Sequence, residues 1–332
     1  MTTIAASIQR PDAAEHRALR EGVGLFDRSE RGKLAVSGDE AADFVDSLLS
    51  NDIRGLAAGA GCYATLLTHK GRLLADVRAL RTVDGVWLDT ERPGLQALFD
   101  NLRQFGIGYR AELHKRTLER GLLSLIGPGS DALVGQTLPG PQEHEHTGVS
   151  VAGIEALAVR TDVGIDLICV SERSAELYAA LEAGGARAVG EPAVECLRVE
   201  RGRPRFGVDM DETTMPQEAA INLRAVSYTK GCYVGQETVA RLYWRGKPNR
   251  HLRGLRLSAE VAPGAVLRLE GAEVGALATV ALSPVHGPIA LALVRRAAVP
   301  GDVLRVGEDG AVTATVTELP FAPAIVPGDA PA

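Results

Sequence analysis

Residues 228–256 hold the largest concentration of side chains that could bind an anionic ligand with a planar ring. The segment has one acid, Glu237, and four of the chain's fourteen aromatic residues. Its seven basic residues are Lys230, Arg241, Arg245, Lys247, Arg250, Arg253 and Arg256. Seven positive charges minus one negative charge give +6, within a chain whose formal net charge is −6. Guanidinium groups pair with carboxylates and phosphates, and aromatic faces stack on rings. A solvated basic surface and a site for single-stranded nucleic acid are the alternatives.

Within this segment lies the octapeptide K-G-C-Y-V-G-Q-E at residues 230–237. Two glycines flank Cys232, the ammonium of Lys230 lies two residues before it, and a predicted helix begins near Gln236. A nearby ammonium and a helix N-terminus both favour a thiolate over a thiol. The pattern therefore indicates a reactive or metal-competent Cys232. The alternative is an inert, buried small hydrophobic residue.

Glu200 is the second candidate. It falls in the last turn of a helix predicted over residues 193–201 and ended by Gly202. The helix dipole disfavours a negative charge there, so the carboxylate needs partners. One possible partner is a ligand edge with two parallel N–H donors, such as the amino group and ring N–H of a pterin. The alternative is an ion pair with a neighbouring arginine. The candidates are Arg201, Arg203 and Arg205.

Asp76 and the run at residues 143–146 also carry groups that could act on a proton or bind a metal. Asp76 follows a hairpin turn at residues 69–72, in which Gly71 is expected to take a positive φ. Its carboxylate could stabilise charge or handle a proton, or it could be an exposed strand residue. The run E-H-E-H at 143–146 lacks the i,i+4 spacing of helical metal ligands and lies in a Pro/Gly-rich stretch. It is interpreted as a solvated loop.

The elements that must position these side chains are of mixed type. At ~150 residues per domain, 332 residues suggest about two domains. Helices, strands and turns alternate up to about residue 251 without the regular spacing of a doubly wound sheet, which indicates an α+β body. From about Leu252 onward, short strands predict a small all-β barrel or sandwich. The net charge of −6 and the absence of phosphate-loop motifs make nucleic-acid and nucleotide ligands unlikely partners.

The cysteines, the N-terminal residues and one long segment without Asp, Glu, Lys or Arg indicate where the protein is located and which metal sites it lacks. The four cysteines lie far apart with no CxxC pair, which argues against a disulfide framework or a four-thiolate site. The N-terminal residues lack a secretory pattern, so a cytoplasmic location is expected. Residues 274–294 carry no Asp, Glu, Lys or Arg and are long enough to cross a bilayer. Pro284, Gly287 and Pro288 interrupt them, so two strands and no membrane contact are predicted.

Several segments together resemble a known family. The octapeptide, followed by T-V-A-R at 238–241, is similar to the K-G-C-Y-x-G-Q-E signature of YgfZ-type folate-binding proteins, whose mitochondrial homologues act in iron–sulfur cluster assembly. The resemblance extends over about residues 20–256. Its supporting segments are G-L-F-D at 24–27, G-K at 32–33, L-S-N-D at 49–52, K-G-R at 70–72, R-V-E-R-G-R-P-R at 198–205 with Gly207 and Asp209, and M-P-Q at 215–217. The octapeptide is the specific part.

The wider superfamily is that of the glycine-cleavage T-protein, a tetrahydrofolate-dependent aminomethyltransferase. The resemblance implies an α+β fold, with a three-lobed folate-binding body over residues 1–248. A small all-β barrel over 249–320 and a flexible tail over 321–332 would follow. It also implies tetrahydrofolate or a one-carbon derivative as cofactor, with Glu200 holding the pterin. The other candidate cofactor-binding residues are Lys230, Tyr233, Gln236, Arg241 and Arg245, of which the two arginines would meet the glutamate tail.

One departure bears on the activity. Asp76 matches one member of an Asp-Asp pair of the T-protein, and Ala75 replaces the other, which argues against methylene transfer. The cysteine motif points instead to a folate-dependent role in synthesis or repair of iron–sulfur clusters, with Cys232 and Asp76 as reactive residues. Iron–sulfur proteins or an assembly scaffold would be partners, because one thiol cannot hold a cluster alone. A folate-dependent aminomethyltransferase or demethylase is the first alternative, and an RNA-binding module is the second.

Overall fold

A computed structural model of the protein describes residues 8–135 and 137–321, and its contacts divide the chain into two compact units. Within the described residues, the barrel unit comprises residues 8–16, 190–209 and 248–321. The two-sheet unit comprises residues 17–189 and 210–247. The barrel unit thus recruits two segments that precede the barrel in sequence. Of the predicted flexible tail, residues 322–332 lie outside the described residues.

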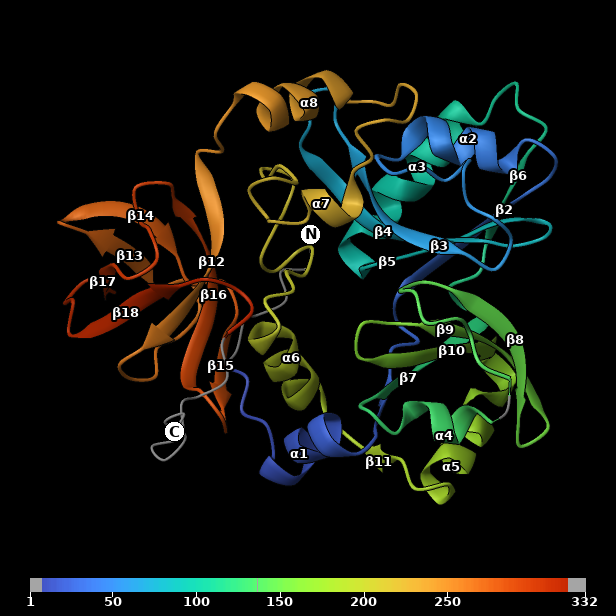
Figure 1. The fold of residues 1–332 in the computed structure, drawn as a ribbon, viewed down its shortest axis with the longest axis horizontal. Helices are drawn as coiled ribbons and strands as arrows, with labels where there is room; N and C mark the ends of the chain where they lie inside the picture. Colours follow the sequence, from blue (N-terminus) through green and yellow to red (C-terminus); the bar gives the residue numbers. More distant parts are fainter. Residues whose placement is uncertain (1–7, 136, 322–332) are drawn as a thin grey trace, which may run out of the picture. The chain divides into compact units, whose positions relative to one another are not determined.

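The barrel unit contains a closed six-stranded barrel in the order β12-β18-β17-β13-β14-β16, with β16 pairing back to β12 (Figure 1). β15 pairs with β16 as a seventh strand. The strands are β12 (Arg250–Leu257), β13 (Val266–Leu269), β14 (Ala272–Ala276), β15 (Val280–Ser283), β16 (Gly287–Arg295), β17 (Val303–Val306) and β18 (Val312–Thr317). The predicted small barrel is confirmed. Residues 274–294 form strands as expected, and no helix within the described residues is long and apolar enough to span a membrane.

Helix α6 (Glu191–Glu200) packs on β15 and β16 of the same unit. Its Cys196 and Val199 are buried among Ala281, Ile289 and Leu291. An ion pair on the opposite side of the helix fixes it further, because the Arg198 guanidinium lies 2.6 Å from the Asp209 carboxylate. Packing and pairing together hold the C-terminal turn of α6, which carries Glu200.

The first sheet of the two-sheet unit has apolar side chains on one face and charged side chains on the other. Its order is β3-β4-β5-β2-β6. The strands are β2 (Gly32–Ser37), β3 (Gly61–Leu67), β4 (Leu73–Arg81), β5 (Gly85–Thr90) and β6 (Glu112–Lys115). The apolar face packs on α2 (Ala41–Leu48) and α3 (Leu95–Phe105). Because successive strand residues point to opposite faces, Asp76 and Arg78 of β4 share the other face with Asp89 of β5.

The second sheet stacks against that charged face (Figure 1). Its order is β11-β1-β7-β10-β9-β8. The strands are β1 (Gly24–Asp27), β7 (Arg120–Ile126), β8 (His146–Val151), β9 (Ile154–Arg160), β10 (Gly164–Val170) and β11 (Arg187–Ala188), and α4 (Ser130–Val134) and α5 (Ser174–Ala183) cover the far side. An apolar group of Leu80, Leu122, Val159 and Ile168 joins the two sheets beside the charged residues. Those charges are therefore enclosed between sheets.

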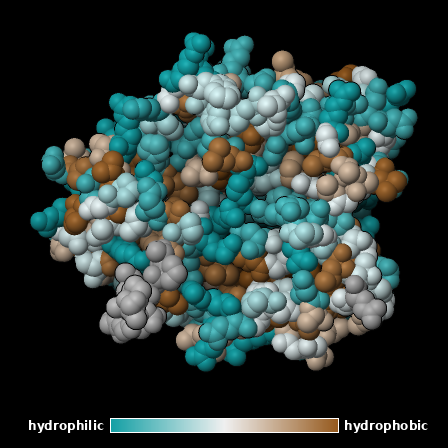
Figure 2. Space-filling model, viewed as in Figure 1, coloured by the Kyte–Doolittle hydropathy of each residue, from teal (hydrophilic) through white to brown (hydrophobic). Residues whose placement is uncertain are grey.

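The remaining elements are α1 (Ala13–Glu21), η1 (Arg92–Gly94), η2 (Ser171–Arg173), α7 (Asn222–Ala225) and α8 (Gln236–Arg245). Helix α1 begins where the Asp12 carboxylate accepts hydrogen bonds from the N–H groups of Ala14 and Glu15, at 2.8 and 3.0 Å. Hydrophobic side chains on the viewed face form separate groups among hydrophilic ones (Figure 2).

Candidate functional site

Asp76 lies buried on β4 with one carboxylate oxygen paired and the other unpaired. The Tyr63 hydroxyl on β3 donates to Oδ2 at 2.9 Å, whereas Oδ1 has no hydrogen-bond partner among the described residues. Burial, together with the Glu91 carboxylate, raises the pKa of Asp76 to about 6, against the opposing effect of Arg31. A carboxyl group with this pKa exchanges a proton near neutral pH. Its unpaired oxygen makes it a candidate to accept an N–H or O–H group of a ligand.

A buried charge network surrounds Asp76. The Arg78 guanidinium lies 2.6 Å from both the Asp89 and Asp166 carboxylates, and Arg31 lies 2.9 Å from Asp89 and also pairs with Glu91. Burial alone would raise the pKa of Asp89, but Arg78 and Arg31 hold it below its usual value. Asp89 is therefore ionised at neutral pH, and it fixes Arg31 near Asp76.

The raised pKa of Asp76 predicts a specific pH dependence of stability. The native state binds this proton more tightly than the unfolded chain, so wild-type stability falls as pH rises from ~4 to ~6. The variant Asp76→Asn has no such titration. The free energy of unfolding of Asp76→Asn minus that of wild type is expected to increase by about 2 kcal/mol between pH 4 and pH 8. Urea unfolding of both proteins at the two pH values measures this difference. A difference that does not change with pH would contradict the raised pKa of Asp76.

The octapeptide packs against the hairpin turn that precedes β4. Gly235 has φ 86°, and a Cβ on it would lie 2.4 Å from the Thr68 carbonyl oxygen, so only glycine fits before α8. Gly71 takes φ 72°, as predicted. Cys232 is exposed, and Tyr233 is buried. The two sequence motifs that the resemblance singled out thus contact one another in the two-sheet unit.

Lys230 is turned toward the end of α2. Its ammonium donates to the carbonyl oxygens of Asp46, Leu49 and Asn51 at 2.5, 2.9 and 2.9 Å, and it lies 3.0 Å from the Asp46 carboxylate. The thiol that it influences is Cys62, whose pKa is raised by burial to about 12 despite this positive charge. Lys230 therefore holds the octapeptide on α2, and a ligand would have to displace these oxygens to reach it.

Removing the Lys230 ammonium is expected to destabilise the chain. The variant Lys230→Met keeps the apolar stem but leaves carbonyl oxygens at the α2 terminus without their donor. We expect a loss of about 2 kcal/mol in the free energy of unfolding, measured with urea. Lys70→Met is the matched control, since Lys70 is exposed on the hairpin turn, and it should change stability by less than about 0.5 kcal/mol. Equal losses would rule out the capping role.

The remaining basic candidates lie on α8. Gln236 is its first residue, and Arg241 and Arg245 are exposed along it. Tyr243 of the same helix stacks on Tyr228 with ring centroids 3.9 Å apart, and Trp244 is 69% exposed. The structure therefore presents arginine and aromatic side chains together on one short helix.

The solvated-loop interpretation of residues 143–146 is wrong. His144 and His146 are 9% and 7% exposed. Burial, reinforced by the positive charges of Arg78 and Arg224, lowers the pKa of His144 to about 3. Glu143 pairs with Arg224, whose guanidinium lies 5.2 Å from the centre of the Tyr63 ring. Tyr63 and Arg224 were missed, and Glu143 was considered only as part of the E-H-E-H run. The signal for Tyr63 was the alternation of polar with apolar residues at 63–66 of β3.

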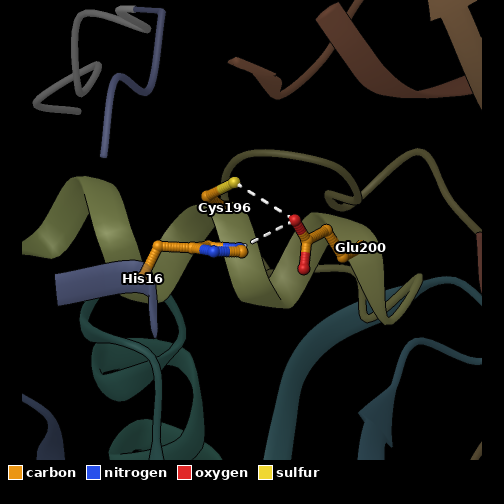
Figure 3. A group of neighbouring side chains, drawn as sticks. All are labelled: His16, Cys196 and Glu200. Carbon is orange, nitrogen blue, oxygen red and sulfur yellow. Dashed lines mark hydrogen bonds and ion pairs between the residues drawn. The ribbon is translucent and has the colours of Figure 1, made fainter. Parts of the chain in front are cut away.

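Glu200 is buried at the end of α6 in the barrel unit, with 5% of its surface exposed. Its Oε1 accepts hydrogen bonds from Nε2 of His16 at 2.9 Å and from the Ser283 hydroxyl at 2.5 Å, and Sγ of Cys196 lies 3.7 Å away (Figure 3). The predicted need for partners is confirmed. These partners come from α1, from β15 and from one turn earlier in α6, and none of them is among the candidates that the sequence offered, a pterin edge or a neighbouring arginine. Of those arginines, Arg205 pairs with Glu191 at 2.9 Å.

Comparison with known proteins places the chain in a family. The profile of the GCVT N-terminal domain matches residues 5–230, which is more than half of the chain. The chain belongs to the GCVT family. The aminomethyltransferase of Symbiobacterium thermophilum is 30% identical over 345 residues, covering 92% of this chain and 88% of that protein. The aminomethyltransferase of Chloroherpeton thalassium is 28% identical over 289 residues, covering 82% of this chain and 79% of that protein.

A solved structure confirms the fold of this GCVT-family chain. The glycine cleavage system aminomethyltransferase T from Bartonella henselae matches with a TM-score of 0.83 and 27% identity, covering 93% of this chain and 89% of that one. The predicted α+β, T-protein-like fold with a C-terminal barrel is therefore confirmed. The aminomethyltransferases of the GCVT family use tetrahydrofolate.

Proposed function

We propose that this chain binds tetrahydrofolate or a one-carbon derivative of it, with Glu200 receiving the pterin. The observation that carries the proposal is the buried Glu200 carboxylate, which His16 and Ser283 hold in place at the end of α6. A carboxylate in a fixed orientation suits the parallel amino and ring N–H donors of a pterin. Membership of a family whose aminomethyltransferases use tetrahydrofolate supports the same ligand.

Asp76 has the properties of a proton-handling group in this proposal. Its pKa of about 6 and its unpaired Oδ1 suit it to take a proton from, or return one to, a nitrogen of the bound folate. Tyr63 fixes the carboxyl plane through its hydrogen bond to Oδ2. On α8, Arg241 and Arg245 are exposed cations that suit the carboxylates of the folate glutamate tail. Tyr233 and Gln236 remain candidate contacts beside them.

We further propose that the chain acts in synthesis or repair of iron–sulfur clusters, as YgfZ-type proteins do. The exposed thiol of Cys232, just before the N-terminus of α8, supports this role. Because clusters usually take four ligands, an iron–sulfur protein or an assembly scaffold would have to supply the others. The second candidate, a folate-dependent aminomethyltransferase or demethylase, is favoured by Asp76 with its raised pKa and by likeness to aminomethyltransferases over most of the chain.

Three measurements test the proposal. Titration of the full chain with tetrahydrofolate should show saturable binding, and its absence would reject every folate-based function. In cells that lack the chain, the wild type should restore iron–sulfur enzyme activities under oxidative stress, and Cys232→Ser should not. Cys62→Ser, at a partly buried thiol outside the octapeptide, is the matched control. Turnover of an aminomethyl or N-methyl donor that Asp76→Asn abolishes would favour the transferase.

A further inference from the structure

Three side chains of metal-ligating type lie close together at the end of α6. Nε2 of His16, Sγ of Cys196 and a carboxylate oxygen of Glu200 all lie within 4.8 Å of one another, and all three side chains are buried (Figure 3). Among residues 8–135 and 137–321, this is the one group of at least three His, Cys, Asp or Glu side chains with such spacing. Cys196 and Glu200 are four residues apart on α6, which places them on one side of the helix. His16 faces them from α1.

We propose that His16, Cys196 and Glu200 bind Zn²⁺. Imidazole nitrogen, thiolate sulfur and carboxylate oxygen are all zinc ligands, and three protein ligands with one open position are typical of reactive zinc sites. Tetrahedral bonds of ~2.0–2.3 Å require ligand atoms roughly 3.3–3.7 Å apart. The His16–Glu200 and Cys196–Glu200 atom pairs lie 2.9 and 3.7 Å apart, and the His16–Cys196 pair lies within 4.8 Å, so movements of about 1 Å would complete the site.

The surroundings of the three side chains suit a metal site. The Ser283 hydroxyl oxygen accepts the N–H groups of Val285 and His286 at 3.1 and 3.0 Å, which directs its proton to Glu200. Outer hydrogen bonds of this kind orient metal ligands. Cys196 itself packs against apolar side chains of the barrel unit, and a dry environment strengthens charge interactions. A merely hydrogen-bonded carboxylate would gain little from the thiol, whose contact at 3.7 Å is long and weak.

Binding of Zn²⁺ at this group involves no change of oxidation state. The S–H bond of Cys196 breaks, a metal–sulfur bond forms, and one proton leaves to water. The Nε2–H proton of neutral His16 moves to Nδ1 by exchange with water, which frees the Nε2 lone pair. Nε2 and the Glu200 oxygen then give up their mutual hydrogen bond and bind the ion. The proposal goes beyond folate binding and does not depend on it. Zn²⁺ and tetrahydrofolate would both bind to Glu200, however. Bound Zn²⁺ should therefore weaken the binding of tetrahydrofolate if the proposed function is also correct.

Cobalt provides a spectroscopic probe of this site. The full chain carrying Cys232→Ser, which removes the exposed thiol, is stripped of metal and titrated with Co²⁺. We expect one Co²⁺ per chain, thiolate-to-cobalt charge-transfer absorption, and displacement by Zn²⁺. In the same background, Cys196→Ala should abolish the absorption, and His16→Gln should weaken Zn²⁺ binding by at least about 100-fold. Cys62→Ala, at a partly buried thiol outside the group, should leave both unchanged.

Two outcomes would overturn the proposal: no thiolate absorption at saturating Co²⁺, or absorption that survives Cys196→Ala. Circular dichroism checks that each variant is folded. If Cys196→Ala does not fold, X-ray absorption of the zinc-loaded chain identifies the atoms bound to zinc. We expect one sulfur ligand, and a shell of only nitrogen and oxygen would reject the site. Failure of tetrahydrofolate to bind would reject the proposed function alone, since the cobalt measurement is made without folate.

Discussion

Replacing Asp89 by asparagine is expected to lower the free energy of unfolding by about 3 kcal/mol at neutral pH. Asp89 is fully buried between the two sheets and accepts hydrogen bonds from both Arg31 and Arg78. A neutral amide there would leave two buried guanidinium groups short of one negative charge, and its NH₂ group would face one of them. Desolvated cations without full compensation are strongly destabilising.

The matched control for this substitution is Asp131→Asn. Asp131 also pairs with an arginine, Arg160, at 2.5 Å, but its side chain is 47% exposed. Water screens that pair, so we expect a loss of less than about 1 kcal/mol. Urea unfolding of both variants at pH 7 measures the difference, and equal losses would show that burial does not decide the effect. The Asp89 contribution should be present above its ordinary pKa and disappear as pH falls through its lowered native pKa.

Glu200→Gln is expected to weaken tetrahydrofolate binding by at least about 100-fold. The amide keeps the size of the side chain but removes its charge and places an NH₂ group where the proposed pterin presents N–H donors. A buried donor facing another donor is left without a partner, which penalises the bound state. Isothermal titration of the full chain with tetrahydrofolate measures the affinity.

The control for Glu200 lies on the same helix. Glu191, in the first turn of α6, has a side chain that is 58% exposed and pairs with Arg205. Glu191→Gln should change folate affinity by less than about twofold, because an exposed pair contributes little. Equal affinities of wild type and Glu200→Gln would show that the pterin is held elsewhere. Comparison of melting curves separates loss of binding from loss of folding.

Local sequence signals were sufficient for several features. Helix α8 starts at Gln236 as expected, and α6 ends at Glu200, one residue before the predicted end. Gly71 takes the positive φ that its turn demands. These features depend on side-chain periodicity and on glycine, which act within a few residues. The α+β class and the small barrel followed from the same local patterns, together with the resemblance.

Tertiary structure alone decided the environment of each candidate residue. His16 and Ser283 reach Glu200 from 184 and 83 positions away, and Lys230 donates to the C-cap carbonyl oxygen of α2, at Leu49, 181 positions earlier in the chain. His144 and His146, interpreted as solvated, are buried because chain segments distant in sequence cover them. The pKa of Asp76 depends on burial between sheets and on Glu91. Residue types and short-range conformation are local properties, whereas burial and charge pairing depend on which distant segments meet.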